Sequence, residues 1–395
     1  MPNRVIIHCD GDNYYAAIEE KHNPSLKNVP IAVCGDPAMR HSIVMSRNKL
    51  AKRAGVISGI SFHQAKQICP GLVYITADKS KYLAETLIIR DIFNKYSDTV
   101  IPYSLDESWI DLGPVSYREG AQIAELIRIE IKYALGLSAS LGVSFNYVFS
   151  KIGSDYQKPD SVTIITQDNY KEIVWALPVS RLLFVGEYRE NILQNAGIIT
   201  VGDIAKADPM YMNRLLGKVG LDLQRFANGD DRSFNPAYDR IRSLGSTLTP
   251  PADLRSVEDV SAILYMLTTA VCARLKKHRL KTYRISVHWR DSDFNKTIRQ
   301  LSFKISTDNV NYIFNHAYDL FNKIYKWKRP LRSLGLRAVG LDRMEQLTLL
   351  PYDEVELCID IDSRLKKLIS KFGHLKVEES AMTKDWYPCA EDIYA

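Results

Sequence analysis

The sequence predicts a protein of several domains in which α-helices and β-strands are mixed. The chain has 395 residues, too many for one ordinary hydrophobic core, so two to four domains are expected. Up to about residue 166, short apolar runs alternate with amphipathic helical patterns, which favours an α/β or an α+β sheet domain. An all-helical stretch at 167–235 and a second mixed stretch at 240–343 follow.

The first stretch provides six predicted strands and six predicted helices. The strands are apolar runs bounded by turn residues, and the helices repeat apolar residues every three or four positions. The strands are expected at Val5–Cys9, Ile31–Cys34, Thr99–Tyr103, Ser108–Leu112, Ser138–Ser144 and Val162–Thr166. The helices are expected at 13–20, 46–54, 62–68, 80–96, 118–135 and 146–156.

The later stretches differ from the first in pattern. Residues 167–235 show helical periodicity interrupted only by short glycine turns, and the turn-rich residues 228–238 predict a linker. Beyond it, two long helices are expected near 256–278 and 310–325. Three strands are expected there, at Tyr283–Trp289, Ile298–Ile305 and Leu331–Leu341.

Charge is distributed unevenly along the chain, whose net charge is +6. Residues 239–343 hold 20 Lys and Arg against 9 Asp and Glu, giving +11, whereas residues 344–395 hold 6 against 11, giving −5. The first 238 residues are neutral. In the basic module aromatic residues interleave with the cations, as in Lys326-Trp-Lys-Arg329. This pattern favours binding to a nucleic-acid backbone, and the alternative is a merely solvated surface.

Other classes of protein are not indicated. No apolar stretch approaches the length of a membrane span, and the amino terminus has no signal-peptide pattern. The six cysteines are scattered without pairing or zinc-binding spacing. We therefore expect a cytoplasmic protein without a membrane or a zinc site.

One acidic element follows the first predicted strand. Asp10 and Gly11 come directly after Val5–Cys9, at the end of a strand where sheet proteins often place ligands. Gly11 lets the backbone approach an ion or a phosphate closely. A helix is expected from about Asn13, with Asp12 or Asn13 as its N-cap.

A second acidic element, Asp106-Glu107, lies almost a hundred residues downstream, before the predicted strand Ser108–Leu112. Neighbouring side chains of a strand point to opposite faces, but a tight hairpin would bring both carboxylates to one edge. Anions gathered there require a cation, and Mg²⁺ is the usual oxygen-bound one. By itself the pair also fits a polar hairpin turn, and Asp10 upstream favours the metal site.

Together these pieces resemble the Y-family DNA polymerases, the translesion class that includes bacterial DNA polymerase IV. The resemblance covers about 340 residues, and some features near residue 50 are similar to the polymerase V catalytic subunit. It rests on three motifs: Asp10-Gly-Asp12 with Tyr14-Tyr15-Ala16 and Glu19; Ser104-Leu-Asp-Glu-Ser108; and Gly142-Val-Ser144 with Lys151-Ile152, Asp155 and Lys158-Pro159.

This resemblance implies a right-hand polymerase with a ferredoxin-like palm, small fingers, a helical thumb and an α/β little finger. The palm would comprise residues 1–10 and 78–166, and the fingers residues 11–77. The thumb would cover 167–235 and the little finger 240–343, which places the basic module on the DNA duplex. Residues 344–395 would form a clamp-binding segment and an acidic tail.

The resemblance also implies the chemistry, which is template-directed addition of deoxynucleotides to a primer 3′ end, with low fidelity and for translesion synthesis in DNA repair. Two Mg²⁺ ions, with Mn²⁺ as a substitute, would stabilise the attacking and leaving oxygens. By motif position the catalytic carboxylates are Asp10, Asp106 and Glu107, and the Gly11 carbonyl would help to bind metal. Asp12 is expected to cap the helix.

Nucleotide contacts follow from the same resemblance. Tyr15 matches the steric gate that excludes ribonucleotides, and Tyr14 lies beside it, although helix core is the alternative for both. Triphosphate contacts are expected from Ser46, Lys49, Lys52 and Lys158. Lys49 and Lys52 stand where the family commonly has Tyr and Arg, and an exposed basic helix face is their alternative.

The expected partners are primer–template DNA, deoxynucleoside triphosphates and the bacterial sliding clamp, with the protein as a monomer. The clamp contact is expected from Gln346, Leu347, Leu349 and Leu350. In the thumb, Phe184-Val-Gly186 departs from the family's Gly-x-Gly hairpin, which leaves its grip on backbone phosphate open. Two other functions stay open: a catalytically weak or inactive accessory protein that binds DNA and the clamp, and a nucleotide cyclase built on a similar palm.

Overall fold

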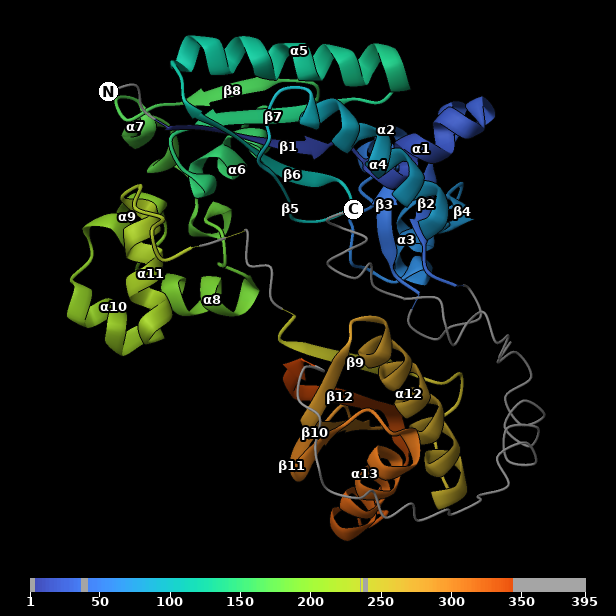
Figure 1. Ribbon diagram of the computed structural model, residues 1–395. Helices are drawn as coiled ribbons and strands as arrows, with labels where there is room; N and C mark the ends of the chain where they lie inside the picture. Colours follow the sequence, from blue (N-terminus) through green and yellow to red (C-terminus); the bar gives the residue numbers. More distant parts are fainter. Residues whose placement is uncertain (1–3, 37–41, 235, 237–240, 344–395) are drawn as a thin grey trace. The chain divides into compact units, whose positions relative to one another are not determined.

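The computed structural model describes residues 4–36, 42–234, 236 and 241–343, which form two compact units (Figure 1). Of the described residues, the first unit holds 4–34, 43–234 and 236, and the second holds 35–36, 42 and 241–343. Among the described residues, no helix is both long enough and apolar enough to cross a membrane.

A five-stranded sheet forms the centre of the first unit, with strand order β5-β6-β1-β7-β8. The apolar strand β1 (Arg4–Gly11) lies in the middle and is antiparallel to β6 (Glu107–Pro114) and β7 (Ala139–Ser144). The edges are β5 (Val100–Pro102) and β8 (Val162–Ile165). All five strands agree with the prediction to within two residues at either end.

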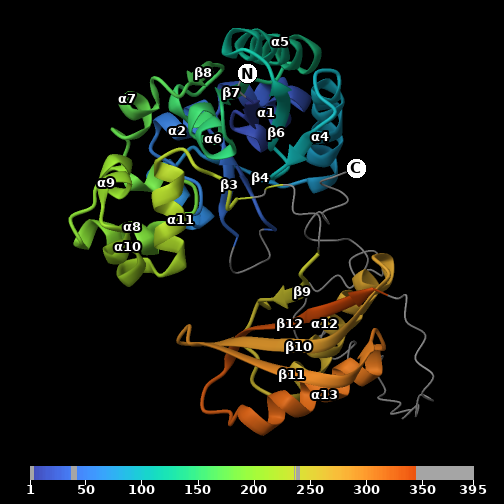
Figure 2. The same ribbon diagram turned by 60° about the vertical axis from the view of Figure 1, so that its left-hand side comes forward.

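Helices cover both faces of this sheet (Figures 1 and 2). On one face lie α4 (Lys79–Asn94) and α5 (Tyr117–Leu135), which share a core with alternate residues of β1: Val5, Ile7 and Cys9. On the other face lies α6 (Tyr147–Tyr156). It lies so close to β7 that a Cβ at Gly142 would be 1.9 Å from the Ser150 carbonyl oxygen. Only glycine permits this approach.

A smaller sheet, with strand order β3-β2-β4, follows β1 in the chain. The strand β2 (Ile31–Cys34) pairs antiparallel with β3 (Val44–Arg47) and parallel with β4 (Val73–Thr76). Around it lie α1 (Tyr14–His22), the 3₁₀ turn η1 (Pro24–Asn28), α2 (Lys49–Arg53) and α3 (Phe62–Ile68). The strands β3 and β4 were not predicted.

The prediction of a helix at 46–54 is wrong at its start. Residues 46 and 47 belong to β3, and α2 begins only after Asn48. The Asn48 side-chain oxygen, Oδ1, accepts hydrogen bonds from Ala51 N at 3.0 Å and Ile31 N at 3.2 Å. Its amide group donates to Glu20 and to the Val29 carbonyl, each at 2.8 Å. Asn48 is therefore a buried structural residue that joins the small sheet to α2.

The helical stretch agrees with the prediction. Its elements are α7 (Tyr170–Val174), η2 (Val179–Arg181), α8 (Glu187–Asn195), α9 (Val201–Lys206), α10 (Pro209–Leu216) and α11 (Lys218–Ala227). Phe184, at the position of the family's hairpin, has a φ of 70°, a left-handed conformation that favours glycine. Its ring packs 5.5 Å from Phe234 and 6.1 Å from Phe226, which compensates for the strained backbone.

The first part of the predicted linker at 228–238 packs against the rest of the first unit. Asn146 donates to the Gly229 carbonyl at 2.9 Å, and Asp231 accepts from Tyr147 N at 2.7 Å. The Phe234 ring lies 5.7 Å from Trp109 of the large sheet. Because of these contacts, residues 228–234 fix the helical stretch to the start of α6.

The second unit is a four-stranded antiparallel sheet with strand order β11-β10-β12-β9 (Figures 1 and 2). Its two helices lie on one face and share a single apolar core with it. The elements are β9 (Ser243–Leu248), α12 (Val257–Lys277), β10 (Leu280–Asp291), β11 (Lys296–Thr307), α13 (Val310–Ile324) and β12 (Leu331–Arg343). Only β9 was not predicted.

Candidate active site

The pairing of β1 with β6 brings two of the predicted carboxylates together. Asp10 at the end of β1 is the direct cross-strand partner of Glu107 at the start of β6, and His8 is the partner of Trp109. Cross-strand partners lie on the same face of a sheet. Since His8 contacts Ser154 of α6 at 2.8 Å, this is the face that α6 covers. Asp10 and Glu107 therefore lie at one end of that face.

The third carboxylate, Asp106, lies in the turn that leads into β6. The Gly11 N–H donates to the Asp106 carbonyl at 3.0 Å, which fixes the turn against the end of β1. The Ser104 hydroxyl donates to the Asp106 carboxylate at 2.6 Å and accepts from Glu107 N at 3.1 Å. The turn is therefore closed by Ser104 and places Asp106 beside the other two acids.

Two lysines from α6 and the loop after it engage these acids. Lys158 Nζ lies 2.6 Å from Asp10 and 2.9 Å from Asp155. Lys151 forms an ion pair with Glu107 and lies 5.0 Å from the centre of the Tyr103 ring. Lys151 was part of a recognised motif, but the sequence assigned it no role.

His8 is a fully buried part of this network. Its Nε2 is 3.3 Å from the Glu107 carboxylate, and Nδ1 contacts Ser154. Burial lowers the pKa of His8 to about 4, so the ring is neutral at pH 7.

The three carboxylates differ in their titration. Burial raises the pKa of Asp10 to about 7, against the opposing charge of Lys158, and burial also raises the pKa of Asp106. Burial alone would raise the pKa of Glu107, but the contacts with His8 and Lys151 lower it to about 2. The two lysines thus do not neutralise all the negative charge of the three carboxylates, and the site can accept a further positive ion.

The donor set fits a hard divalent cation, which prefers carboxylate and carbonyl oxygens. In the described part of the chain, no group of three or more His, Cys, Asp or Glu side chains has an arrangement that could hold a metal ion. The reason is that Lys158 holds Asp10, Ser104 holds Asp106, and Lys151 holds Glu107. Binding of a metal therefore requires these side chains to turn from their present partners.

Asp12 does not cap α1, so that prediction is wrong. The N-cap is Asn13, with a φ of 50° and no side-chain bond to the helix. Instead the Ser46 hydroxyl of β3 accepts from Ala16 N in the first turn at 3.3 Å. The Asp12 carboxylate accepts bonds from other elements, because the chain turns sharply at Asn13. Ser46, predicted to contact the nucleotide, is buried at this helix start.

Tyr14 and Tyr15 have different environments. Tyr14 is buried, and its hydroxyl bonds to Thr86 at 2.9 Å, so the core interpretation holds for it. Tyr15 is half-buried and stacks on Tyr82, with ring centres 4.6 Å apart. Burial and the charge of Asp106 raise the pKa of Tyr15 to about 12. Tyr15 thus lies within electrostatic reach of the carboxylates.

Tyr82 supports the Tyr15 ring and was not singled out from the sequence. Its hydroxyl donates to Glu19 at 2.7 Å, and Lys81 pairs with the same carboxylate at 2.9 Å. The acid of the first motif, Glu19, therefore holds the ring that supports Tyr15. The helical spacing of Tyr15 and Glu19, four residues apart, was the available signal.

The remaining predicted residues are not gathered with the carboxylates by any contact. Lys49 and Lys52 are exposed on α2, and neither forms an ion pair within the described ranges. Both cations are therefore available to a ligand. The clamp segment, with Gln346, Leu347, Leu349 and Leu350, lies outside the described residues.

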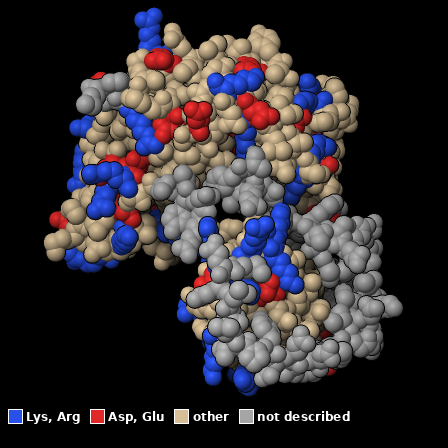
Figure 3. Space-filling model, viewed as in Figure 1, with Lys and Arg blue, Asp and Glu red and all other residues tan. Residues whose placement is uncertain are grey.

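The second unit presents a basic sheet face opposite its helices. Arg284, Ser286, His288 and Arg290 of β10 alternate with the core residues Ile285, Val287 and Trp289. The strand register places Lys296 beside Arg290, and Arg337 beside Ser286. In the part of the chain that the structure describes, no acidic partner is found for the four cations of this face, which are Arg284, Arg290, Lys296 and Arg337. Figure 3 shows Lys and Arg gathered on the visible side of this unit.

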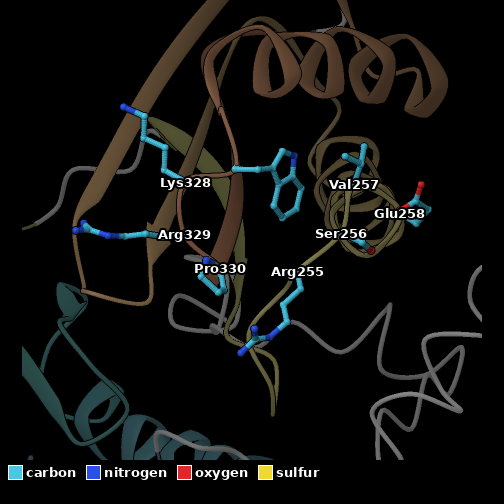
Figure 4. Close-up of a pocket in the computed structure, with 8 residues that line it drawn as sticks. Arg255, Ser256, Val257, Glu258, Lys328, Arg329 and Pro330 are labelled. Atoms are coloured by element: carbon cyan, nitrogen blue, oxygen red, sulfur yellow. The ribbon is translucent and has the colours of Figure 1, made fainter.

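A shallow pocket of about 470 Å³ also lies in the second unit (Figure 4). It is lined by Arg255, Ser256, Val257 and Glu258 at the start of α12, and by Trp327, Lys328, Arg329 and Pro330. The side chains of Lys328 and Arg329 extend away from Val257 and Glu258. The three carboxylates Asp10, Asp106 and Glu107 do not line this pocket, so it is not part of the candidate active site.

Known proteins are similar to this chain over most of its length. Residues 9–155 match the impB/mucB/samB family, and residues 241–349 match its C-terminal domain. The chain is 38% identical to DNA polymerase IV of Acetivibrio thermocellus over 97% of this chain and 98% of that protein. It is 31% identical to DNA polymerase IV of Streptococcus sanguinis over 86% of this chain and 97% of that protein.

Solved structures with the same fold are Y-family polymerases. A Y-family chimera of Dbh and Dpo4 aligns with a TM-score of 0.76 and 24% identity, over 86% of this chain and 99% of that one. An insertion ternary complex of Dbh DNA polymerase aligns with a TM-score of 0.60 and 23% identity, over 86% and 99%. The chain belongs to the impB/mucB/samB family, the Y-family DNA polymerases. The relatives named above are both DNA polymerase IV.

Proposed function

We propose that the protein is a DNA-directed DNA polymerase that extends a primer 3′ end on a template and acts in translesion synthesis. The observation that carries the proposal is the convergence of Asp10, Asp106 and Glu107 at one end of the large sheet, in a chain of this family. Such a site suits transfer of a nucleotide to a hydroxyl, in which charge develops on phosphate oxygens. The carboxylates also argue against an inactive accessory protein.

Asp10, Asp106, Glu107 and the Gly11 carbonyl would hold divalent metal, with Mg²⁺ as the expected ion and Mn²⁺ as its substitute. The bound ions would neutralise the attacking and leaving oxygens of the displacement at the α-phosphate. Ser104 orients Asp106, while Lys151 and His8 orient Glu107. These partners hold the acids at one end of the sheet until a metal ion binds and replaces them.

Nucleotide selection is assigned to Tyr15 with Tyr14 behind it. The Tyr15 ring, supported by Tyr82, would lie under the sugar of the nucleotide and exclude a 2′-hydroxyl. Lys158, Lys49 and Lys52 would neutralise the triphosphate, and Ser46 would add a hydroxyl contact. Lysines act there as point charges, without the fork geometry of arginine.

DNA binding is assigned to the basic sheet face of the second unit. Its unpartnered cations, with Arg284 and Arg337 among them, suit phosphates of a duplex without regard to base sequence. A polymerase held mainly by such contacts dissociates readily, which fits distributive synthesis. We also expect the protein to be a monomer and to have low fidelity. Action in the cytoplasm on chromosomal DNA completes the proposal.

Primer extension tests the catalytic assignment. We expect Asp106→Ala to lower the rate of nucleotide addition by about 10³-fold or more, since it removes a ligand that stabilises transition-state charge. The matched control is Asp98→Ala, an exposed acid on the same unit. Undiminished synthesis by Asp106→Ala would refute the proposed mechanism. Wild-type protein that binds DNA but never extends a primer with Mg²⁺ or Mn²⁺ would favour the accessory role.

The clamp assignment is tested separately. We expect combined Gln346→Ala and Leu349→Ala replacements to abolish stimulation by the sliding clamp, because they remove two of the four side chains expected to contact the clamp. Basal synthesis without the clamp should stay at the wild-type rate. Equal stimulation of the variant would exclude this segment as the clamp contact.

A further inference from the structure

Asp12 is a buried acid for which the proposed chemistry has no use. Its side chain is 5% exposed, and it has no ion-pair partner among the described residues. Burying a carboxylate without a counter-charge is unfavourable unless hydrogen bonds replace its hydration. The groups that supply these bonds therefore indicate what the residue does.

Each carboxylate oxygen of Asp12 accepts a bond from a distant part of the chain. The Ser140 hydroxyl of β7 donates to Oδ1 at 2.8 Å, and Asp160 N donates to Oδ2 at 2.8 Å. The backbone N–H of Asp12 donates to the Ser138 carbonyl at 2.9 Å. Asp12 thus joins the end of β1 to β7 and to the loop between α6 and β8.

This loop carries Lys158. The Asp160 amide that binds Asp12 lies two residues after Lys158, whose Nζ is 2.6 Å from Asp10. On its outer side, the Asp160 carboxylate pairs with Arg128, and with Lys132 at 2.5 Å, both on α5. The loop is therefore fixed from inside by Asp12 and from outside by α5.

We infer that Asp12 is a positioning residue that holds the 157–161 loop so that the Lys158 ammonium stands beside Asp10, where it can meet the triphosphate of the incoming nucleotide. The inference rests on the proposed contact of Lys158 with phosphate. Asp12 acts through the loop backbone and does not touch the nucleotide.

The competing assignment is that Asp12 ligates metal, as its spacing of two from Asp10 suggests. The contacts separate the two assignments, because both Asp12 oxygens are used by neutral donors. In Asp12→Asn the amide oxygen can still accept from Asp160 N. The amide nitrogen can donate to Ser140, since a hydroxyl also accepts. Asparagine therefore preserves a positioning role, whereas a metal ligand needs the negative charge.

The test measures the Kd of the correct deoxynucleotide for enzyme on a dideoxy-terminated primer, where binding is separated from turnover. We expect Asp12→Ala and Lys158→Ala each to weaken binding about tenfold, the loss of roughly one charge-assisted contact. Asp12→Asn should stay within about twofold of the wild type. The Asp12→Ala, Lys158→Ala double variant should bind no more weakly than Lys158→Ala, because residues that act through one contact are not additive.

Two control variants isolate the contact with the loop. Ser140→Ala removes the bond to Oδ1 but leaves the bond from Asp160 N, so nucleotide binding should change less than about twofold. Asp160→Gly keeps the amide that binds Asp12 but removes the ion pairs with Arg128 and Lys132, and glycine suits the φ of 55° there. If the inner contact holds Lys158 in place, nucleotide binding should again change less than about twofold. Melting temperature and DNA affinity report on folding, and Asp12→Ser, which is too short to reach both donors, replaces Asp12→Ala if that variant does not fold.

Three results would overturn the inference. Equal loss in Asp12→Asn and Asp12→Ala would assign Asp12 a role that needs its charge. Multiplied losses in the double variant would show that Asp12 does not act through Lys158. Weakened binding in Asp12→Ala with unchanged binding in Lys158→Ala would remove Lys158 from the phosphate site, while primer extension by Asp106→Ala still decides the proposed activity independently.

Discussion

The carboxylate site of the first unit and the basic face of the second use charge in opposite ways. In the carboxylate site each charge is buried or half-buried and engaged by a named partner, as Glu107 is by Lys151 and His8. On the basic face, cations such as Arg290 and Arg337 are without acidic partners among the described residues. The paired charges of the carboxylate site hold individual side chains in position, whereas the unpaired cations of the basic face together create a positive electrostatic potential.

The difference shows how burial determines what a charge can do. Inside the first unit the effective dielectric is low, so one neighbour changes the titration of an acid greatly. On a surface, water and salt screen each cation, and no single one is essential. We therefore expect replacements in the first region to have large specific effects and replacements in the second to have small additive ones.

After the loss of synthesis expected for Asp106→Ala, the next largest effect is expected at Tyr15. Tyr15→Ala should reduce discrimination against ribonucleotides by roughly a hundredfold, because it removes the ring that excludes the 2′-hydroxyl. The measurement is the ratio of kcat/KM for deoxynucleotides to that for ribonucleotides. Tyr15→Phe keeps the ring and should keep the selection. Unchanged sugar selection in Tyr15→Ala would show that Tyr15 is not the residue that excludes ribonucleotides.

An effect on stability follows from the opposite pKa shifts of two acids in one site. The pKa of Asp10 is raised from 3.8 to about 7, so the folded protein binds more protons in that window and loses stability as pH rises through it. The pKa of Glu107 is lowered from 4.5 to about 2, so its stabilisation is complete above pH 4.5 and is lost as pH falls toward 2.

Metal-free thermal melting measures this contrast. Asp10→Asn should raise the melting temperature at pH 8 by about 5 °C and by less at pH 5, since it removes a buried charge. Glu107→Gln should lower it at both pH values, because it leaves Lys151 unpaired. Equal shifts of the same sign in both variants would show that the two acids are not in different environments.

The smallest effect is expected on the basic face. Arg337→Ala should weaken DNA binding only a few-fold and should reduce the slope of log affinity against log salt by about 0.9, the contribution of one phosphate contact. Lys323→Ala on α13, on the helical side of the sheet, is the matched control and should leave the slope unchanged. A large loss from Arg337→Ala alone would indicate a specific contact instead of a field.

Much of the fold could be predicted because its longer elements have strong local patterns. The strand β1 and the helices α5 and α12 combine an apolar periodicity with caps such as Ser116 and Ser256. The strands β3, β4 and β9 were not predicted; β3 and β4 are held by pairing with β2, and β9 is held by pairing with β12. The helix expected from residue 46 failed because Ser46 is held in a strand by its pairing with Val33.

The candidate site was predicted in composition but not in arrangement. The sequence by itself determined which acids are present, that Asp10 ends a strand, and that a basic module follows. These are local properties of residue type and spacing. Only the tertiary structure decided that Asp10 lies opposite Glu107, that Lys158 stands beside Asp10, and that Asp12 holds the 157–161 loop. Those contacts join residues about a hundred or more positions apart, and strand register and packing, which no local pattern encodes, determine them.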